Sequence, residues 1–484
     1  MTIPDEPTTE PAVARDGLEL DPETMRTLGY RVVDLLVERI SLLGETRAWR
    51  GASRAEMESR LREPPPAGPS SFDEILRRLG ADVFPFTGHH DHPRFFGYIP
   101  SCPTWPGILG DFLASGVNVF QGTWLQSAGA STVELVVLDW FRQWIGYPGQ
   151  ASGVLVSGGS QANLTALASA RETKAGGRTE SAVVYVSTQG HSSVTRALRI
   201  LGFRSEQVRA LPVDGRFRLR PDALAAAIEQ DVRAGRQPFL VVANAGATNT
   251  GAIDPLAELA AVCAERNVWL HVDAAYGGFA VLTERGRRWL AGLDQADSVT
   301  LDPHKWLYQP YECGCLLVRE GPLLSQAFQI MPDYLQDTAV GGVEVNFADR
   351  GIQLTRSARA LKLWLSLQYF GVDAFRAAID RTLDLALAAA ERIRASDELE
   401  LLSPATLGVV CFRRRPAGVD EEGTLERLNA ELDRRLAESG EGMVSSTRVD
   451  GRYALRLCVL NHRSRIEDVE RVVGWLERAP VAPT

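Results

Sequence analysis

The sequence predicts an α/β fold with a mostly parallel central sheet. Its central part alternates short, continuous apolar runs with longer amphipathic stretches. Continuous apolar runs are typical of strands that are buried on both faces, and their alternation with helices is typical of parallel sheets. We therefore expect helices on both faces of the sheet and a ligand site at the carboxyl ends of its strands.

Six apolar runs are expected to form the strands, at 153–158, 182–187, 239–246, 268–276, 298–303 and 314–319. Between them, apolar residues recur three and four positions apart, as in amphipathic helices. These helices are expected at 160–174, 193–202, 221–235 and 255–267.

The chain is expected to divide into four parts. Residues 1–17 are acidic and rich in proline, which predicts a disordered tail. Residues 18–92 form a helical arm that has little core of its own and is expected to pack on another body, such as a second subunit. Residues 93–355 contain the sheet and form the large domain. Residues 356–484 begin with a long helix and have the pattern of a small α+β domain.

Composition argues against several classes of protein. The 484 residues carry a net charge of −9 with both signs interspersed, and no long basic run indicates nucleic-acid binding. No uncharged apolar run reaches the ~18 residues of a membrane span, and the N-terminus lacks the features of a secretory signal. The six cysteines are scattered without the paired spacing of a zinc site. We therefore expect reduced cysteines and a cytoplasmic location.

Three lysines stand among 52 lysine and arginine residues, and one of them, Lys305, lies in "TLDPHKWLYQP". A lysine amine can lose its proton and attack a carbonyl, whereas an arginine guanidinium stays charged. Lys305 follows an apolar run, so it is expected at the carboxyl end of a strand. The alternative is a lysine in a surface salt bridge. Of the other two, Lys174 is expected to be exposed, and Lys362 to extend from among aliphatic residues toward solvent.

Asp273, in "HVDAAYGG", also ends a strand-like run, 32 residues before Lys305. A lysine that forms an imine and a carboxylate that keeps a pyridine nitrogen protonated together suit pyridoxal phosphate (PLP). A lone aspartate at a strand end is more often a helix cap, but the pairing with Lys305 disfavours that interpretation. His271 lies two residues earlier, on the same strand face, and is expected to hydrogen-bond Asp273.

A phosphate site is expected at "VSGGSQANLTAL", where a strand, two glycines and a helix start follow one another. Helix N-terminal amides and small residues bind phosphate well, which makes Gly158, Gly159 and Ser160 candidates. The alternative is an ordinary capped helix start. His191 opens a further helix-like segment, and from this corner it could stack on a cofactor ring and transfer protons.

These elements together resemble the group II PLP-dependent amino acid decarboxylases, the family of aromatic-L-amino-acid and tryptophan decarboxylases. The resemblance runs from about Asp21 to the end of the chain. It is densest in "HPRFFGYIPS", "SGGSQANLTAL", "HSSVTRAL", "HVDAAYGG", "DPHKW" and "RALKLW". It implies PLP fold type I and a homodimer with an intertwined N-terminal arm, whose active sites lie between the subunits.

The resemblance also implies roles for individual residues. Lys305 would bind PLP as an imine, Asp273 would pair with the pyridine nitrogen and His191 would stack over the ring. Further cofactor contacts are implied for Gly159, Ser160, Ala275 and His304, and we add Gly158 and Thr248. Tyr98, Pro100 and Ser101 match the family's substrate strip. Ile99 and Phe120 suggest an apolar pocket, with His90 as a polar edge.

Two departures from the family pattern concern the cofactor and substrate sites. Asp302 stands where the family often has asparagine near the phosphate, and a carboxylate there would repel it. We therefore expect Asp302 to point away or to bind another group. The string "HHDH" (89–92) could be interpreted as a metal site, but a polar edge facing the substrate is the favoured interpretation and no metal is expected.

A further departure concerns the product. The family has a mobile loop that closes over the neighbouring subunit's site and carries a tyrosine that protonates the substrate's α-carbon after carbon dioxide leaves. Counting back from "RALKLW" places Phe347 at this position, while Tyr334 lies earlier on the same loop. In related aldehyde synthases this replacement lets dioxygen react, which yields aldehyde, ammonia and peroxide. We expect decarboxylation to an amine, with oxidative decarboxylation and deamination as the alternative.

The expected substrate is an aromatic L-amino acid: tryptophan, tyrosine, phenylalanine or dihydroxyphenylalanine. Glutamate and aspartate are less expected, because no additional arginine is placed for a distal carboxylate. An aminotransferase of the same fold is disfavoured by the decarboxylase-like strips at 93–101 and 271–276. A PLP-sensing regulator would require a DNA-binding module, and the acidic arm has no recognisable one.

Overall fold

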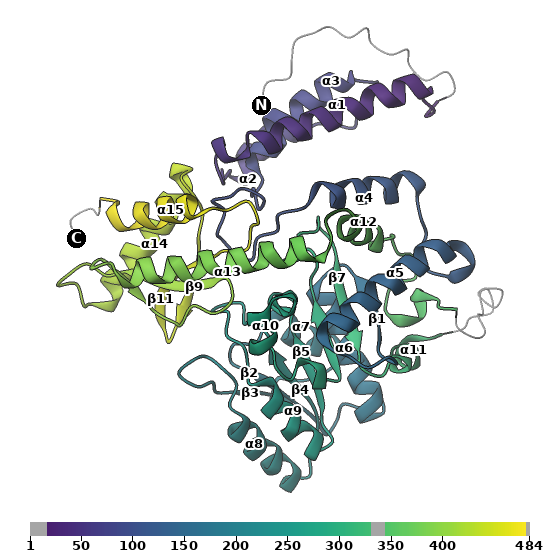
Figure 1. Cartoon of the computed structure of the whole chain (residues 1–484), viewed down its shortest axis with the longest axis vertical. Coiled ribbons are helices and arrows are strands. Elements are labelled where there is room, and N and C mark those ends of the chain that lie inside the picture. The colour runs from purple at the N-terminus through teal and green to yellow at the C-terminus, as the bar shows by residue number, and fades with distance from the viewer. Residues whose placement is uncertain (1–16, 331–343, 481–484) are drawn as a thin grey trace.

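A seven-stranded sheet lies at the centre of the computed structural model, which describes residues 17–330 and 344–480 (Figure 1). The strand order is β1-β7-β6-β5-β4-β2-β3. β7 is antiparallel to both of its neighbours, and the other neighbouring strands are parallel. The strands are β1 (Ser152–Val156), β2 (Ala182–Ser187), β3 (Val208–Leu211), β4 (Gln237–Asn244), β5 (Trp269–Asp273), β6 (Ser298–Leu301) and β7 (Gly314–Val318).

The mostly parallel sheet is confirmed, and each of the six apolar runs overlaps one of its strands. β3 is the strand that the sequence did not predict. It lies at the edge of the sheet and buries only Leu211 fully, so its four residues, which include Arg209, form no apolar run. An edge strand with one buried residue leaves too weak a pattern to be recognised.

Helices pack on both faces of this sheet (Figure 1). The four helices expected between the strands are present as α6 (Gly159–Ala175), α7 (Ser192–Ile200), α8 (Pro221–Arg233) and α9 (Leu256–Glu265). The other helices of the large domain are α4 (Trp105–Val117), α5 (Trp124–Ile145), α10 (Glu284–Trp289) and α11 (Pro322–Phe328). Buried side chains between these layers form one continuous core, whose largest members include Trp269, Trp306 and Tyr185.

The C-terminal part contains an antiparallel sheet of order β10-β11-β9-β8 and a second core. Its elements are β8 (Leu399–Leu401), β9 (Val409–Arg414), α14 (Glu422–Ser439), β10 (Ser445–Val449), β11 (Arg452–Cys458) and α15 (Ile466–Arg478). The long helix α13 (Val372–Arg394) joins the two cores, because Ile379 packs in the first and Ile393 in the second. The small α+β domain is thus present, whereas the exact boundary at 355/356 stays a prediction.

α12 (Ala360–Phe370) precedes α13 and packs closely on α4 of the large domain. Gly110 makes this approach possible, because a Cβ at this position would lie 2.5 Å from the Cα of Lys362. The same contact buries Lys362, whose amine pairs with Asp111 at 2.7 Å. Lys362 is therefore a structural cation between two helices and does not extend to solvent, contrary to the expectation from its sequence context.

The N-terminal arm consists of α1 (Pro22–Ser41), α2 (Arg54–Leu61) and α3 (Phe72–Arg78), which lie together at one end of the molecule (Figure 1). The Asp21 carboxylate caps α1 by accepting from the amides of Glu23 and Thr24. α1 buries only two residues and α2 none, so the arm has almost no core of its own.

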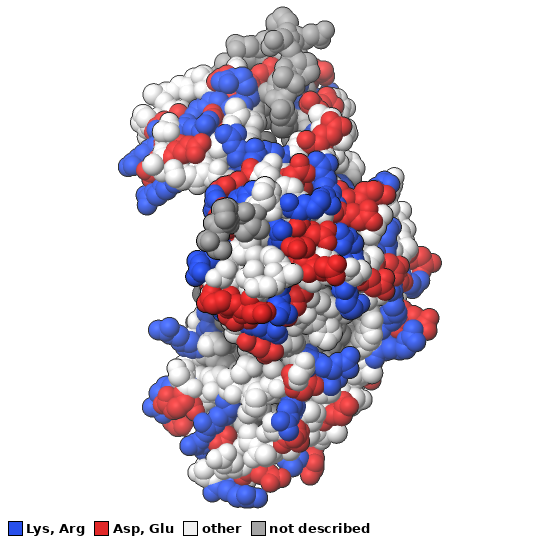
Figure 2. Space-filling view, turned by 90° about the vertical axis from the view of Figure 1, so that its left-hand side faces the viewer, with Lys and Arg blue, Asp and Glu red and all other residues white. Residues whose placement is uncertain are grey.

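Basic and acidic side chains are interspersed over the face of the molecule that Figure 2 shows. Many of them are close enough to form ion pairs, such as those between Arg39 of α1 and Asp91 (2.6 Å) and between Arg285 of α10 and Asp380 of α13 (2.9 Å). Among residues 17–330 and 344–480, no helix is long and apolar enough to span a membrane.

Candidate active site

A cavity of about 320 Å³ opens at the carboxyl edge of the sheet. Asn244, Asp273 and Asp302 reach it from the ends of β4, β5 and β6, and the turn after β1 closes one side. The full lining is Ser157, Gly158, Gly159, Ser160, Asn163, His191, Ser193, Asn244, Gly246, Thr248, Asp273, Ala275, Tyr276, Asp302, His304 and Lys305. The structure thus brings together all nine residues predicted to contact a cofactor.

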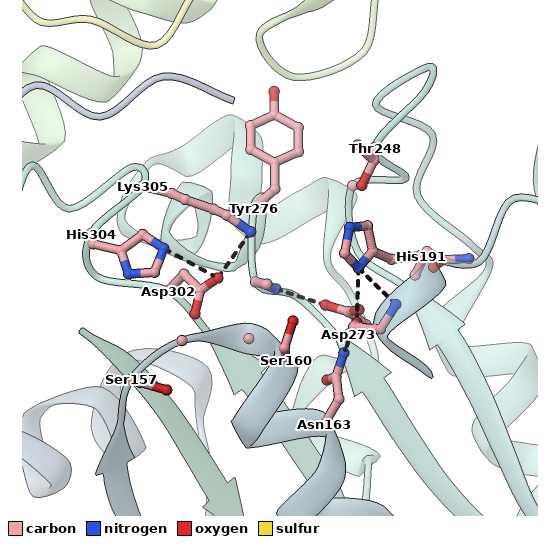
Figure 3. A pocket seen from close by; sticks show the side chains of 16 residues that line it. Ser157, Ser160, Asn163, His191, Thr248, Asp273, Tyr276, Asp302, His304 and Lys305 are labelled. Atoms are coloured by element: carbon pink, nitrogen blue, oxygen red, sulfur yellow. Dashed lines mark hydrogen bonds and ion pairs between the residues drawn. The ribbon is translucent and has the colours of Figure 1, made fainter. Parts of the chain in front are cut away.

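The Asp273 carboxylate is held by two hydrogen bonds at the floor of the cavity (Figure 3). The side-chain amide of Asn163 donates to Oδ2 at 2.9 Å, and the backbone amide of Ala275 donates to Oδ1 at 3.2 Å. The two donors hold the carboxylate in one orientation. Asp273 is only 8% exposed, so its carboxylate faces the cavity and not bulk water.

His271 does not hydrogen-bond Asp273, contrary to the prediction. Its Nδ1 contacts Ser298 Oγ at 2.8 Å and its Nε2 contacts Asn163 Oδ1 at 3.0 Å. Because the ring is fully buried, its pKa falls to about 4, and the imidazole is neutral. The relation between the two residues is indirect, because Asn163 binds both of them.

Lys305 lies in the turn after β6 and extends toward the cavity (Figure 3). Its amine is 2.9 Å from Asp302 Oδ2, and its side chain is 23% exposed. His304 accepts a hydrogen bond from the Cys313 amide at Nδ1, and burial lowers the pKa of its ring. The neutral ring therefore carries its proton on Nε2, 3.6 Å from the same Asp302 oxygen.

The turn between β1 and α6 suits an anion. Gly159 is the first residue of a 17-residue helix, so free amides and the positive end of the helix dipole face the cavity. A Cβ at Gly159 would lie 2.9 Å from Asp302 Oδ2 and 3.1 Å from Ala275 Cβ. Gly159 therefore keeps open the space that a phosphate needs, and Ser160 adds a hydroxyl beside it.

His191 caps the start of α7 and faces the cavity from the side opposite Lys305 (Figure 3). Its Nδ1 accepts from the amide of Ser193 at 3.2 Å and lies 2.8 Å from the Ser193 hydroxyl. Burial is the main cause that lowers the pKa of the ring, so the imidazole is neutral with its proton on Nε2.

The six predicted substrate residues do not line this cavity. Tyr98 is 57% exposed, and its backbone is bound by Ser445 and Arg456 of the small domain. Ser101 is buried, and its hydroxyl donates to the Gln309 carbonyl. Ile99, Pro100 and Phe120 lie outside the lining too. His90 is connected to it indirectly, because it contacts the Tyr311 hydroxyl at 3.2 Å and the Tyr311 ring packs on His304.

The other two histidines of "HHDH" use their ring nitrogens on backbone carbonyls. His89 contacts the carbonyls of Arg47 and Phe84, and His92 contacts that of Thr46. These contacts all lie within residues 18–92, the predicted arm. In the described part of the chain, no group of histidine, cysteine, aspartate and glutamate residues is arranged to hold a metal ion.

Phe347 does not line the cavity of its own chain, and the role in a neighbouring subunit's site that counting back from "RALKLW" implied for it stays a prediction. Its ring is 1% exposed and packs against the guanidinium groups of Arg350 and Arg356, whose central carbons are 5.4 and 4.9 Å from the ring centre. Tyr334, the other candidate for the loop tyrosine, lies outside the described residues.

The lining residues that the sequence did not indicate include Asn163, Ser193, Asn244 and Tyr276. Asn163 had a recognisable signal, since it is a polar residue among the mostly apolar residues that α6 buries. Such a residue needs hydrogen-bond partners, which the polar edge of a sheet provides. The other three have no comparable signal in the sequence.

PLP fits this set of groups. The cavity offers a lysine amine, a carboxylate held by two donors and a helix N-terminus kept open by glycine. When bound, PLP supplies a ring that accepts the electrons released at a substrate's α-carbon. Lys305 would hold its aldehyde carbon, Asp273 would keep a proton on its ring nitrogen, and Gly159 with Ser160 would bind its phosphate.

Comparison with known proteins agrees with this chemistry. Residues 55–415 match the family described as "Pyridoxal-dependent decarboxylase conserved domain". The chain is 42% identical over 460 residues to the aromatic-L-amino-acid decarboxylase of Bacillus atrophaeus, with 95% of this chain and 96% of that protein covered. It is 30% identical over 470 residues to a phenylacetaldehyde synthase of Arabidopsis thaliana, with 94% and 96% covered.

Among solved structures, Oryza sativa TDC with PLP and tryptamine superimposes with a TM-score of 0.89 at 29% identity, over 94% of this chain and 99% of that one. The agreement extends through the arm, the large domain and the small domain, and it identifies the architecture as PLP fold type I. The chain therefore belongs to the pyridoxal-dependent decarboxylase family and is a PLP-dependent carboxy-lyase.

Proposed function

We propose that the protein removes the α-carboxylate of an aromatic L-amino acid and releases the amine and carbon dioxide. The observation that carries this proposal is the pairing of Lys305 and Asp273 across one cavity at the carboxyl edge of the sheet. The aromatic substrate is supported by the relative from Bacillus atrophaeus, whose printed activity is on aromatic L-amino acids and which matches 95% of this chain.

In this proposal each cavity residue has a distinct role. Lys305 would hold the cofactor through its amine until the substrate's amino group takes its place. Asp273 would stabilise positive charge on the nitrogen of the cofactor ring. His191 would cover the ring, and its proton is on Nε2, since Nδ1 is occupied by Ser193. A neutral imidazole with a free N–H is suited to return a proton to the α-carbon.

The amine is favoured over the aldehyde as the product. The aldehyde alternative depends on a phenylalanine at the reaction centre in place of a proton donor. Phe347 is instead buried between two arginines, away from the cavity of its own chain. We therefore infer that Phe347 acts in packing, and that the ring does not determine the product.

The test is a substrate panel with all products measured together. Holoenzyme is given the twenty L-amino acids, and carbon dioxide, amine, aldehyde and peroxide are quantified. We expect equal amounts of carbon dioxide and amine from aromatic substrates. Peroxide with aldehyde would establish the oxidative reaction instead, and turnover that needs a keto acid and releases no carbon dioxide would indicate an aminotransferase.

Lys305→Ala should abolish the visible absorbance band of bound PLP and reduce turnover by at least 10³-fold, because the amine acts as a nucleophile. Lys174→Ala is the matched control, since Lys174 is exposed at the end of α6 and contacts Asn267. A Lys305→Ala protein that keeps the band would contradict the assignment of this lysine.

We further propose that two copies of the chain assemble into a dimer. Support comes from large apolar side chains that a single chain leaves exposed on helices near the arm. Phe112 and Val117 of α4 are 65% and 73% exposed, Leu125 of α5 is 69% exposed and Tyr369 of α12 is 73% exposed. Apolar residues gathered on adjoining helices indicate an interaction surface. A second copy would cover this surface and also provide the arm with a body to pack on.

A cytoplasmic location is also proposed. All six cysteines are free and buried. A protein that keeps six thiols reduced suits a reducing compartment.

A further inference from the structure

Asp302 occupies the point where the lysine and the phosphate site meet. It follows β6 directly, and its side chain is 2% exposed. Its Oδ2 lies 2.9 Å from the Lys305 amine, and a Cβ added to Gly159 would lie 2.9 Å from the same oxygen. Figure 3 shows the carboxylate between Lys305 and the start of α6. It is a second acidic group in the cavity, in addition to Asp273.

The partners of Asp302 are few for a buried carboxylate. Lys305 is the cation that pairs with it, and His304 approaches it as a neutral ring because burial lowers the pKa of that histidine. Among the described residues, its Oδ1 is buried and has no hydrogen-bond partner. Burial of a carboxylate that has one cation partner and an unsatisfied oxygen costs free energy. Loss of the ion pair with Lys305 would leave the Asp302 charge without compensation.

Binding of the cofactor would disrupt the ion pair between Asp302 and Lys305. The amine that neutralises Asp302 is the amine that must bond to the cofactor's aldehyde carbon. The phosphate would at the same time bring negative charge to the N-terminus of α6, against which Asp302 lies. Two like charges in a buried site repel each other strongly. Asp302 thus pairs with the Lys305 amine while that amine is free and would oppose the phosphate of the bound cofactor.

We propose that Asp302 is a positioning residue that holds Lys305 toward the cavity before PLP binds and then weakens the hold on its phosphate. The consequence is a cofactor that exchanges with solution far more readily than it would if an uncharged residue stood at this position. This inference rests on the proposed binding of PLP in the cavity, and it concerns the phosphate group specifically.

The test compares cofactors with and without the phosphate. Holoenzyme of wild type and Asp302→Asn is loaded with PLP or with pyridoxal and dialysed against known free concentrations, with the visible band of the bound cofactor as readout. We expect Asp302→Asn to lower the Kd for PLP at least tenfold and to change the Kd for pyridoxal by less than threefold. Asp302→Glu, which keeps the charge, should stay within threefold of wild type for both.

Asp231→Asn is the matched control, since Asp231 is a buried carboxylate of α8 that pairs with Arg209 and Arg236 away from the cavity. It should alter neither Kd. An Asp302→Asn protein that folds, as judged by circular dichroism, and binds PLP no more tightly than wild type would overturn the inference. Equal tightening for PLP and pyridoxal would overturn it as well, because the effect would then act through Lys305 alone.

The two proposals fail in different ways. If wild type shows no visible band with PLP, the proposed function itself falls. If wild type shows the band and only the comparison with Asp302→Asn gives no difference, the inference about Asp302 falls and the proposed function stands.

Discussion

Asn163 joins the floor of the cavity to the elements around it. Its amide nitrogen donates to Asp273 and Ser193, and its oxygen lies 3.0 Å from His271 Nε2 and accepts from Thr300 at 2.7 Å. One side chain of α6 thereby satisfies groups on β5, β6 and α7. Because all four contacts are buried, each depends on the presence of the others.

Asn163→Ala should therefore affect stability and the cofactor together. The change leaves buried partners without a hydrogen bond, at a cost of about 1–3 kcal/mol each, and removes a donor from Asp273. We expect a lower free energy of unfolding in urea and an altered absorbance band of bound PLP. Ser169→Ala on the same helix is the control, since the Ser169 hydroxyl donates only to the carbonyl of Thr165. A band identical to wild type in Asn163→Ala would contradict the proposed link to Asp273.

Among single residues, the sequence was informative where a residue type was unusual for its position. Lys305 and Asp273 could be predicted because a lysine in an arginine-rich chain and an aspartate at a strand end both required explanation. The network around them could not, because Asn163 and Asp273 are 110 residues apart in the sequence. Their contact depends on how α6 crosses the sheet, which no local pattern records.

Among the elements, strand β1 has an unusual outer edge. β1 pairs with β7 on one side, and on the other its backbone is satisfied by side chains. The Leu155 amide donates to Glu134 of α5, the Leu155 carbonyl accepts from Arg356, and Arg350 donates to the Gly153 carbonyl. Side chains that occupy the backbone groups of an edge strand prevent it from pairing with another chain.

Arg356→Met should destabilise this edge strongly. Arg356 and Glu134 form an ion pair of 2.7 Å in which both side chains are 2% exposed or less. Removal of one partner leaves an uncompensated buried charge, which costs about 3–5 kcal/mol. The free energy of unfolding in urea measures this effect, and a loss below about 1 kcal/mol would contradict it.

Arg142→Met provides the comparison for this prediction. Arg142 lies on the same helix as Glu134, and its pair with Asp139 is half-exposed. A surface pair of this kind contributes about 0–1 kcal/mol to the free energy of unfolding, so Arg142→Met should cost no more than this.

The same edge holds Phe347. Its position relative to "RALKLW" suggested a residue of the reaction centre, whereas the alternation of apolar and polar residues in "VEVNF" is also typical of a half-buried extended segment. In the structure the ring packs against the guanidinium groups of Arg356 and Arg350 beside β1 and belongs to the large core. The sequence pattern was thus consistent with burial, and the role of Phe347 in a neighbouring subunit's site stays a prediction.

For the molecule as a whole, the exposed apolar residues near the arm predict an oligomer. Size-exclusion chromatography with light scattering should give wild type the molar mass of two chains of 52.9 kDa each. Phe112→Asp should lower the measured mass to that of one chain. A charge placed at the centre of an apolar interface is costly to bury.

The control for this prediction is Val232→Asp on α8, whose side chain is 58% exposed and does not belong to the helices near the arm. It should leave the mass unchanged. A wild-type protein that elutes as a single chain at micromolar concentration would contradict the proposed dimer.

The large-scale organisation was more predictable than its boundaries. Alternating strands and helices predicted the central sheet, and the low apolar content of the arm predicted that it would have little core. The division between domains was harder to place, because α13 contributes apolar residues to both cores. A helix shared by two cores has one continuous apolar periodicity, so the sequence does not show where one domain ends and the next begins.

The burial of Lys362 has a consequence for chemical labelling. Its amine is enclosed by Asp111 and the carbonyls of Pro310 and Glu312, so a reagent in solution cannot reach it easily. Lys174 is held at the molecular surface, and the remaining basic residues are arginines, which do not form stable adducts with aldehydes under mild conditions. Borohydride reduction in the presence of a reactive aldehyde would therefore attach a mass tag to Lys305 with few competing lysines. The chain's replacement of lysine by arginine makes its cavity amine directly identifiable by peptide mass spectrometry.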